Sequence, residues 1–284
     1  MRCICFLLFL GLARPSPASA HGDLHDQIAT VTSQINQDPT NAAPYLKRGE
    51  LHRVHGDWEA ALSDYEQVTR LDPNFGAIDY FRGRMLLEAD RPKPARECLD
   101  RFLTGQPDHA EALIARARVS VKLGKPEAAV KDFTRALGRL GEPKPELYLE
   151  RADAVMSRNG RRVEAALRGL DEGMTRLGPV LTLQSRAIDL ELSRKNYDGA
   201  LARLEPLIAK SPRKETLMAQ KGGILQQAGR EKEAREAYTA ALQAVESLPS
   251  THRRTRAMVA LESRLRLALE QPALAAANRR SSKH

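Results

Sequence analysis

Apolar residues recur at steps of three and four along most of the chain. In the stretch 58–71 the recurring side chains are Trp58, Ala61, Leu62, Tyr65, Val68 and Leu71. This spacing places them on one face of an α-helix. Residues 56–65, GDWEAALSDY, return in altered form as GKPEAAVKDF at 124–133, which indicates an internal repeat.

The period of the repeat is 34 residues. Three sets of positions keep this step: Pro39, Pro73 and Pro107; Arg48, Arg82 and Arg116; Ala61, Ala95 and Ala129. Further along, Arg151 and Arg186 follow at steps of 35. The chain is therefore expected to consist of one supersecondary element used several times.

Each period predicts two helices. In the first, residues 44–54 form helix A, Gly56 lies in the turn, and helix B continues from Trp58 until Pro73 ends it. Small residues, among them Gly49, are expected where the two helices approach closely.

The pattern Tyr45…Gly49…Gly56-Asp57-Trp58…Ala61…Tyr65…Pro73 resembles a tetratricopeptide repeat, a helix–turn–helix unit of this period. The resemblance covers most of the chain. It implies an all-α fold, a right-handed α-solenoid of about six repeats with capping helices at both ends. The repeats depart from the pattern at Asp90-Arg91-Pro92, at Asn159–Arg162, at Gly173 and at Lys195-Asn196-Tyr197.

The two ends are expected to differ from the repeats. Residues 1–20 combine Arg2, an apolar stretch and Ala18-Ser19-Ala20, which is typical of a signal peptide cleaved near Ala20. The remaining boundaries are a cap helix in 21–40, repeats in 41–249, a cap helix in 250–270 and a disordered basic tail in 271–284. The protein is then an exported bacterial one, periplasmic or secreted, without stable membrane insertion.

Charge and cysteine content narrow the functional classes. The net charge is +9, but residues 250–284 hold a net +6 and the signal segment two Arg, which leaves about +1 for residues 21–249. The basic end could contact anionic lipid or nucleic acid, but it has no aromatic side chain for base stacking, and a solvated cap is the simpler interpretation. Once Cys3 and Cys5 are removed, Cys98 has no disulfide partner and is expected to be a small buried side chain.

The arginines that follow the period allow two interpretations. They could form a line of cations for an acidic ligand, or each could pair with an Asp sixteen residues later, as Arg48 with Asp64 and Arg116 with Asp132. The resemblance implies that these pairs are structural, and burial favours paired charges. Cys98 stands where the second repeat would have its Asp, which leaves Arg82 available for another role.

The resemblance also implies a binding surface, because ligands of this family usually lie along the groove of A helices. The positions carried over are Leu46, Glu50, Arg53, Tyr80, Arg84, Leu87, Glu88, Ile114, Arg118, Val121, Lys122, Leu149, Asp153 and Met156. Alternating apolar and charged residues suit an extended or helical peptide with apolar anchors and some acidic groups. The alternative is an ordinary solvated helix face. The family's two-carboxylate clamp needs Lys and Asn where this chain has Leu46 and Glu50, so that specificity is not implied.

No catalytic or cofactor motif accompanies this surface. We therefore expect a non-enzymatic scaffold in the cell envelope that needs no cofactor and binds an unidentified protein partner. A mature N-terminal His21, with His25 nearby, offers an alternative role in copper handling, although the ligand set is incomplete. The sequence does not specify the oligomeric state.

Overall fold

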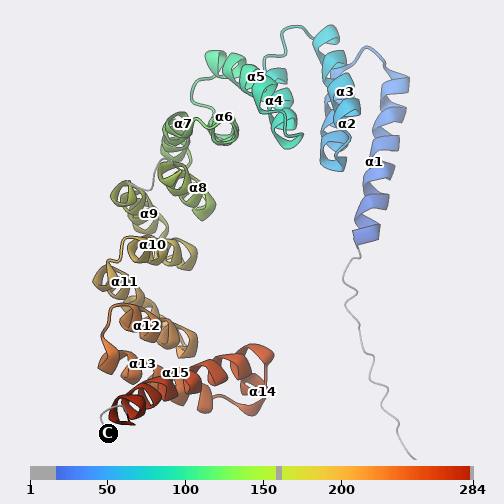
Figure 1. Cartoon of the computed structure of the whole chain (residues 1–284). Helices are drawn as coiled ribbons and strands as arrows, with labels where there is room; N and C mark the ends of the chain where they lie inside the picture. The colour runs from blue at the N-terminus through green and yellow to red at the C-terminus, as the bar shows by residue number, and fades with distance from the viewer. Residues whose placement is uncertain (1–16, 158–161, 282–284) are drawn as a thin grey trace, which may run out of the picture. The chain divides into compact units, whose positions relative to one another are not determined.

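A computed structural model shows fifteen α-helices and no strand in the described part of the chain, residues 17–157 and 162–281 (Figure 1). The chain divides into two compact units, Met1–Gly141 and Glu142–His284. In the first lie α1 (Pro17–Gln37), α2 (Ala42–His55), α3 (Trp58–Leu71), α4 (Ile78–Glu88), α5 (Pro92–Gly105), α6 (Ala110–Lys122) and α7 (Pro126–Arg139). In the second lie α8 (Pro145–Met156), α9 (Val163–Leu177), α10 (Leu181–Ser193), α11 (Tyr197–Lys210), α12 (Glu215–Gln227), α13 (Glu231–Glu246), α14 (Ser250–Arg253) and α15 (Arg256–Ser281).

The helices α2 to α13 form six consecutive A–B pairs, three in each unit, and the two members of each pair pack against each other. The all-α fold and the number of repeats are therefore confirmed. The first helix A is longer than predicted, from Ala42 to His55, because Asn41 caps it by accepting a hydrogen bond from the Ala43 amide at 3.0 Å. The right-handed course of the whole solenoid stays a prediction.

In five of the six pairs the turn between the two helices contains a left-handed backbone residue; the turn of the fourth pair falls on residues 158–161, outside the described part. Gly56, Gly124 and Gly229 supply it, with φ of +84°, +67° and +73°. The second and fifth repeats lack this glycine, and Asp90 and Lys195 adopt the same conformation, with φ of +56° and +61°. The turns at Asp90 and Lys195 depart from the sequence pattern but keep the left-handed backbone geometry, at a cost in backbone strain.

Small residues set the distance between helix A and helix B. A Cβ atom built on Gly49 of α2 would lie 2.7 Å from Cε1 of Tyr65, and one built on Gly83 of α4 would lie 2.6 Å from Cγ of Leu99. Opposite them, Ala61 is completely buried. Tyr65 and Leu99 are buried with it in one apolar core of the first unit.

Both ends are covered by helices with one buried face. In α1, Val31 and Ile35 are buried, and in α15, Leu261 and Leu265 are buried in the core of the second unit. The α1 helix begins at Pro17, inside the predicted signal peptide, whose residues 1–16 lie outside the described part. The α15 helix continues to Ser281 in a stretch for which we expected disorder; its alanines favour helix, and the side chains beyond Glu270 lie outside the described ones.

We predict that Gly49→Ala destabilises the protein by about 1–3 kcal/mol, because the added methyl group overlaps the ring of Tyr65. Gly138→Ala in α7 is the matched control: its Cβ meets no atom within 4 Å, and alanine favours helix. Urea unfolding followed by circular dichroism measures both. Equal stability of the two variants would contradict the close approach.

Candidate functional site

All the predicted groove residues lie on A helices. Each of them is exposed or half-buried there. In the first unit, α2 carries Leu46, Glu50 and Arg53; α4 carries Tyr80, Arg84, Leu87 and Glu88; α6 carries Ile114, Arg118, Val121 and Lys122. In the second unit, α8 carries Leu149, Asp153 and Met156. The site is described for each unit separately.

Glu50 is the centre of a polar network in the first unit. Its carboxylate accepts a hydrogen bond from the Tyr65 hydroxyl at 2.5 Å and one from Nε of Arg53 at 3.2 Å. Arg84 of the next A helix donates to the other carboxylate oxygen. Burial, and then the bond to Glu50, raise the pKa of Tyr65, so its hydroxyl stays protonated and donates.

Three more charged side chains of the predicted groove in the first unit, those of Arg53, Glu88 and Lys122, also pair between successive repeats. Nη1 of Arg53 lies 2.5 Å from Oε2 of Glu88, and Nζ of Lys122 lies 2.7 Å from Oδ1 of Asp90. The second unit repeats the arrangement, with Nη2 of Arg186 in α10 at 2.6 Å from Oδ1 of Asp153. We call these inter-repeat pairs, including Glu50–Arg84, the rungs. The charges expected to contact a ligand are thus engaged within the protein.

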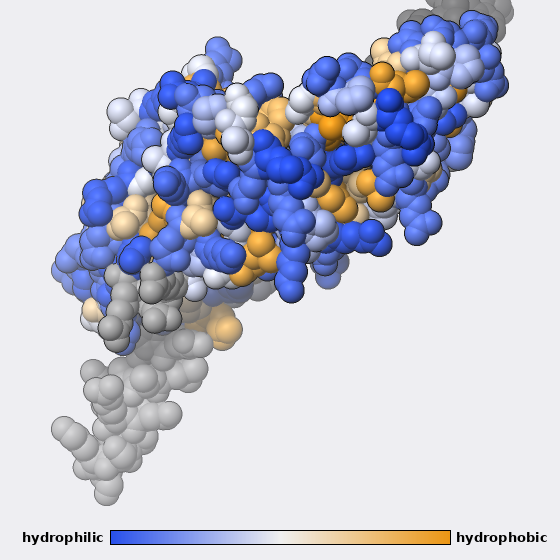
Figure 2. Space-filling model, turned by 90° about the horizontal axis from the view of Figure 1, so that it is seen from above, coloured by the Kyte–Doolittle hydropathy of each residue, from blue (hydrophilic) through white to orange (hydrophobic). Residues whose placement is uncertain are grey.

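The apolar groove residues remain partly accessible. Leu46, Tyr80, Leu87 and Ile114 are half-buried at the edge of the core of the first unit, and Val121 is 47% exposed. In the second unit, Leu149 and Met156 are also half-buried. Figure 2 shows such a mixture on one face of the molecule, where separate hydrophobic patches in orange lie among hydrophilic side chains. Apolar contact, rather than free charge, is what the A-helix face offers.

The structure brings together both Arg–Asp pairs that the sequence predicts. Nη2 of Arg48 lies 2.7 Å from Oδ1 of Asp64, and Nε of Arg116 lies 2.8 Å from Oδ2 of Asp132. Both aspartates are buried, and each arginine makes two hydrogen bonds to its aspartate, which joins helix A to helix B. The hydrogen bond to Asp64 raises the pKa of Arg48, as expected for a structural cation.

The second repeat replaces this pair. Cys98 is buried, and burial raises the pKa of its thiol, so it is a protonated core residue, as predicted. Arg82 donates to the backbone carbonyl of Tyr65 at 3.4 Å, and its buried Nε atom has no hydrogen-bond partner. The freed arginine therefore lies at the junction between helices rather than in the groove.

The fourth repeat replaces the pair differently. Gly169 occupies the position of the aspartate, and the buried Arg151 turns to Oε2 of Glu172 at 2.6 Å and to the Gly169 carbonyl at 3.1 Å. Gly173, which also departs from the sequence pattern, leaves room for Tyr148: a Cβ there would lie 2.8 Å from Cγ of Tyr148. Within this helix pair, Arg151 therefore has other hydrogen-bond partners in place of the aspartate, and the ring of Tyr148 occupies the space beside Gly173.

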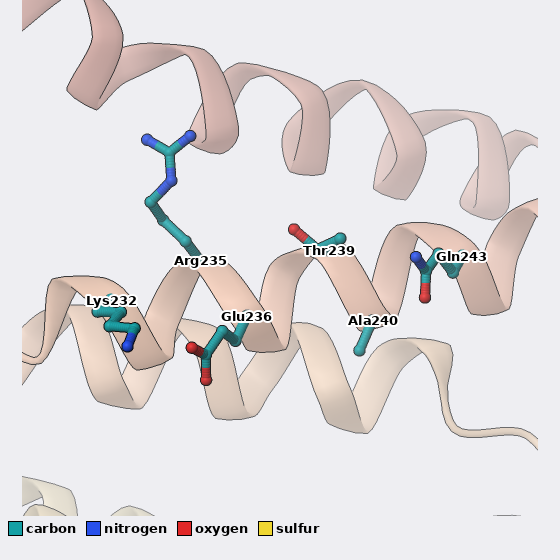
Figure 3. Close-up of a pocket in the computed structure, with 6 residues that line it drawn as sticks. All are labelled: Lys232, Arg235, Glu236, Thr239, Ala240 and Gln243. Carbon is teal, nitrogen blue, oxygen red and sulfur yellow. The ribbon is translucent and has the colours of Figure 1, made fainter.

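Sequence reasoning missed a hollow along one face of α13, with a volume of about 450 Å³. Its lining residues are Lys232, Arg235, Glu236, Thr239, Ala240 and Gln243 (Figure 3). They share one face of the helix, and Arg235 and Glu236 point to opposite sides of it. The lining mixes both signs of charge without a histidine or cysteine, and no motif in the sequence identifies it.

The metal-site residues are only partly described. The side chain of His21 lies outside the described ones, while His25 is exposed, with its ring centroid 4.9 Å from that of His55. Among the described side chains, no three of His, Cys, Asp and Glu are grouped so that they could hold a metal ion. Within the same part of the chain, no helix has the length and apolar character to cross a bilayer.

We predict that Asp64→Ala lowers the free energy of unfolding by about 3 kcal/mol, because the positive charge of Arg48 loses its carboxylate partner. The hydrogen bond from Arg48 to the Thr32 hydroxyl, at 3.1 Å, does not neutralise this charge. Asp132→Ala should cost less, since Arg116 keeps Oδ1 of Asp100 at 2.9 Å. Chemical unfolding of the two variants tests this order, and an equal or larger loss for Asp132→Ala would contradict it.

Matches to known protein families cover most of the chain. Residues 46–110, 87–145 and 114–179 match the family described as "Tetratricopeptide repeat", and residues 171–260 match the one described as "Tetratricopeptide repeat-like domain". The matched stretches run without a break from helix α2 to helix α15.

Curated relatives share only part of their length with this chain. It is 28% identical over 100 residues to "DnaJ homolog subfamily C member 3" of Rattus norvegicus, covering 35% of this chain and 20% of that protein. It is 27% identical over 170 residues to "Cellulose synthase operon protein C" of Pseudomonas fluorescens, covering 55% of this chain and 13% of that protein. The chain thus spans a fifth or less of each.

The fold is similar to that of a solved tetratricopeptide repeat protein from Parabacteroides merdae, with a TM-score of 0.52 and 20% sequence identity. The match covers 87% of this chain and 94% of that one. The six helix pairs, the left-handed turn residues and the Arg–Asp pairs agree with the sequence matches. The chain belongs to the tetratricopeptide repeat proteins, which generally serve as non-enzymatic protein-interaction scaffolds.

Proposed function

We propose that the protein is a scaffold without catalytic activity that binds another polypeptide along the A helices of its first unit, α2, α4 and α6. The observation that carries this proposal is the row of partly accessible apolar side chains on these three successive helices. Its members are Leu46, Tyr80, Leu87, Ile114 and Val121. Accessible apolar side chains in line give a peptide several anchoring points.

The rungs determine which peptides suit this surface. An acidic group approaching Arg84 has to compete with Glu50, and a basic group approaching Glu88 has to compete with Arg53. Breaking such a pair leaves a partly buried charge without its partner, which is unfavourable. We therefore infer that the bound segment is mainly aliphatic or aromatic, with fewer acidic groups than the sequence alone suggests.

We predict that peptides selected from a phage-displayed library on the wild-type protein bind Val121→Asp at least tenfold more weakly, because the substitution places a charge among the apolar anchors. Leu181→Asp is the matched control: Leu181 is 58% exposed, on α10 of the second unit. Fluorescence polarisation measures both affinities. Unchanged affinity for Val121→Asp would reject the site, and an excess of acidic residues in the selected peptides would reject the inferred ligand chemistry.

We further propose that the scaffold acts in the cell envelope, after cleavage of residues 1–20. The support is the signal-like pattern at the N-terminus, from Arg2 to Ala18-Ser19-Ala20. Cleavage there would remove the first four residues of α1 and leave its buried residues Val31 and Ile35 in place.

We predict that expression in a bacterial host gives a periplasmic or secreted protein whose N-terminal residue is His21. N-terminal sequencing of the fractionated protein measures the cleavage site. Ala18→Arg/Ala20→Arg should block processing, because the small-residue positions are lost. A full-length protein starting at Met1 in the cytoplasmic fraction would reject the proposal.

A further inference from the structure

The α15 helix of the second unit has two apolar faces with different surroundings. Leu261 and Leu265 are 4% and 2% exposed and belong to the core that α13 shares. On the other side, Val259 and Leu267 are 51% and 56% exposed. Single exposed apolar side chains are ordinary on a protein surface, but two of this size on one face of one helix form an apolar patch that requires an explanation.

Val259 and Leu267 belong to a longer exposed stripe. Its members are Arg256, Val259, Ala260, Ser263, Leu267 and Glu270, and all of them are exposed. They follow one another at steps of one, three and four, so they share about a quarter of the helix circumference. We call this set the outer stripe of α15. Beside it, Arg266 is engaged within the chain, since it pairs with Glu262 at 2.8 Å and with Glu246 at 2.9 Å.

Four members of the outer stripe are placed symmetrically about Ser263. Arg256 and Glu270 each lie seven residues from Ser263, and Val259 and Leu267 each lie four residues from it. In an antiparallel pair of identical helices, residues at equal distances from the centre lie opposite each other. A two-fold axis at Ser263 would therefore place Arg256 against Glu270 of the second copy and Val259 against Leu267 of the second copy.

We propose that the outer stripe of α15 is a homodimer interface, in which two copies pack antiparallel about Ser263. The small side chain of Ser263 lies on the axis and allows the helices to approach closely at the centre, the apolar pairs flank it, and the ion pairs close both ends. The charges of the stripe cancel, one Arg against one Glu, which favours a second copy over an anionic lipid or nucleic-acid surface.

The size of the stripe sets the strength of the dimer. From Arg256 to Glu270 it spans about 21 Å of helix. Stable interfaces usually bury about 1,200 to 2,000 Å² in total, and four turns of one helix provide an area at or below the lower limit. The dimer is therefore reversible and depends on protein concentration.

Charge reversal tests the interface on the full chain. Sedimentation velocity of the wild type over a concentration series should show a monomer–dimer equilibrium. Arg256→Glu and Glu270→Arg should each weaken the dimer about tenfold or more, because each places like charges opposite each other twice per dimer. The double variant Arg256→Glu/Glu270→Arg should regain wild-type affinity, and an equal mixture of the two single variants should form the heterodimer.

Two control variants change the same charges elsewhere. Arg254→Glu precedes the stripe by two residues, and Glu236→Arg lies on α13; both side chains are exposed and both variants should dimerise like the wild type. Circular dichroism should be unchanged in all variants, because no substituted side chain is buried. A wild type that stays monomeric at the highest concentration, or single reversals that dimerise as the wild type does, would overturn the proposal.

Discussion

The close approach of helix A to helix B is the constraint on which the rest of the structure depends. Gly49 touches the ring of Tyr65 and Gly83 touches Leu99, so neither position accepts a side chain without movement. Because the helices meet this closely, Arg48 can reach Asp64 across the pair and Tyr65 can reach Glu50 on the face of helix A. The packing inside each pair thus determines which polar groups meet between its two helices.

The rungs join one repeat to the next. Glu50 binds Arg84, Arg53 binds Glu88 and, in the second unit, Asp153 binds Arg186. In a repeat protein each pair can bury its apolar face only against a neighbour, and stability is the sum of such neighbour contacts. The charged residues on the A-helix face therefore contribute to stability, and the apolar side chains between them stay partly accessible.

Irregular repeats keep the fold by local compensation. Asp90 and Lys195 adopt the backbone conformation that Gly56, Gly124 and Gly229 have in their turns, and Arg151 has Glu172 and a backbone carbonyl as partners in place of an aspartate. Each change is confined to one pair and its immediate neighbours. A repeat architecture tolerates such changes because its contacts are local.

The helix pairs and their period could be predicted from the sequence, because helical spacing and a 34-residue step leave little freedom within one pair. The Arg48–Asp64 and Arg116–Asp132 contacts were one of two interpretations that the sequence allowed, and the structure has them. The predicted groove residues lie on the first helix of their respective pairs, as the sequence pattern indicated. That Glu50, Arg53, Arg84 and Glu88 bind one another could be seen only in the folded protein. Whether a charge faces solvent or its neighbour depends on distances of a few ångströms between repeats, and periodicity along one chain carries no such information.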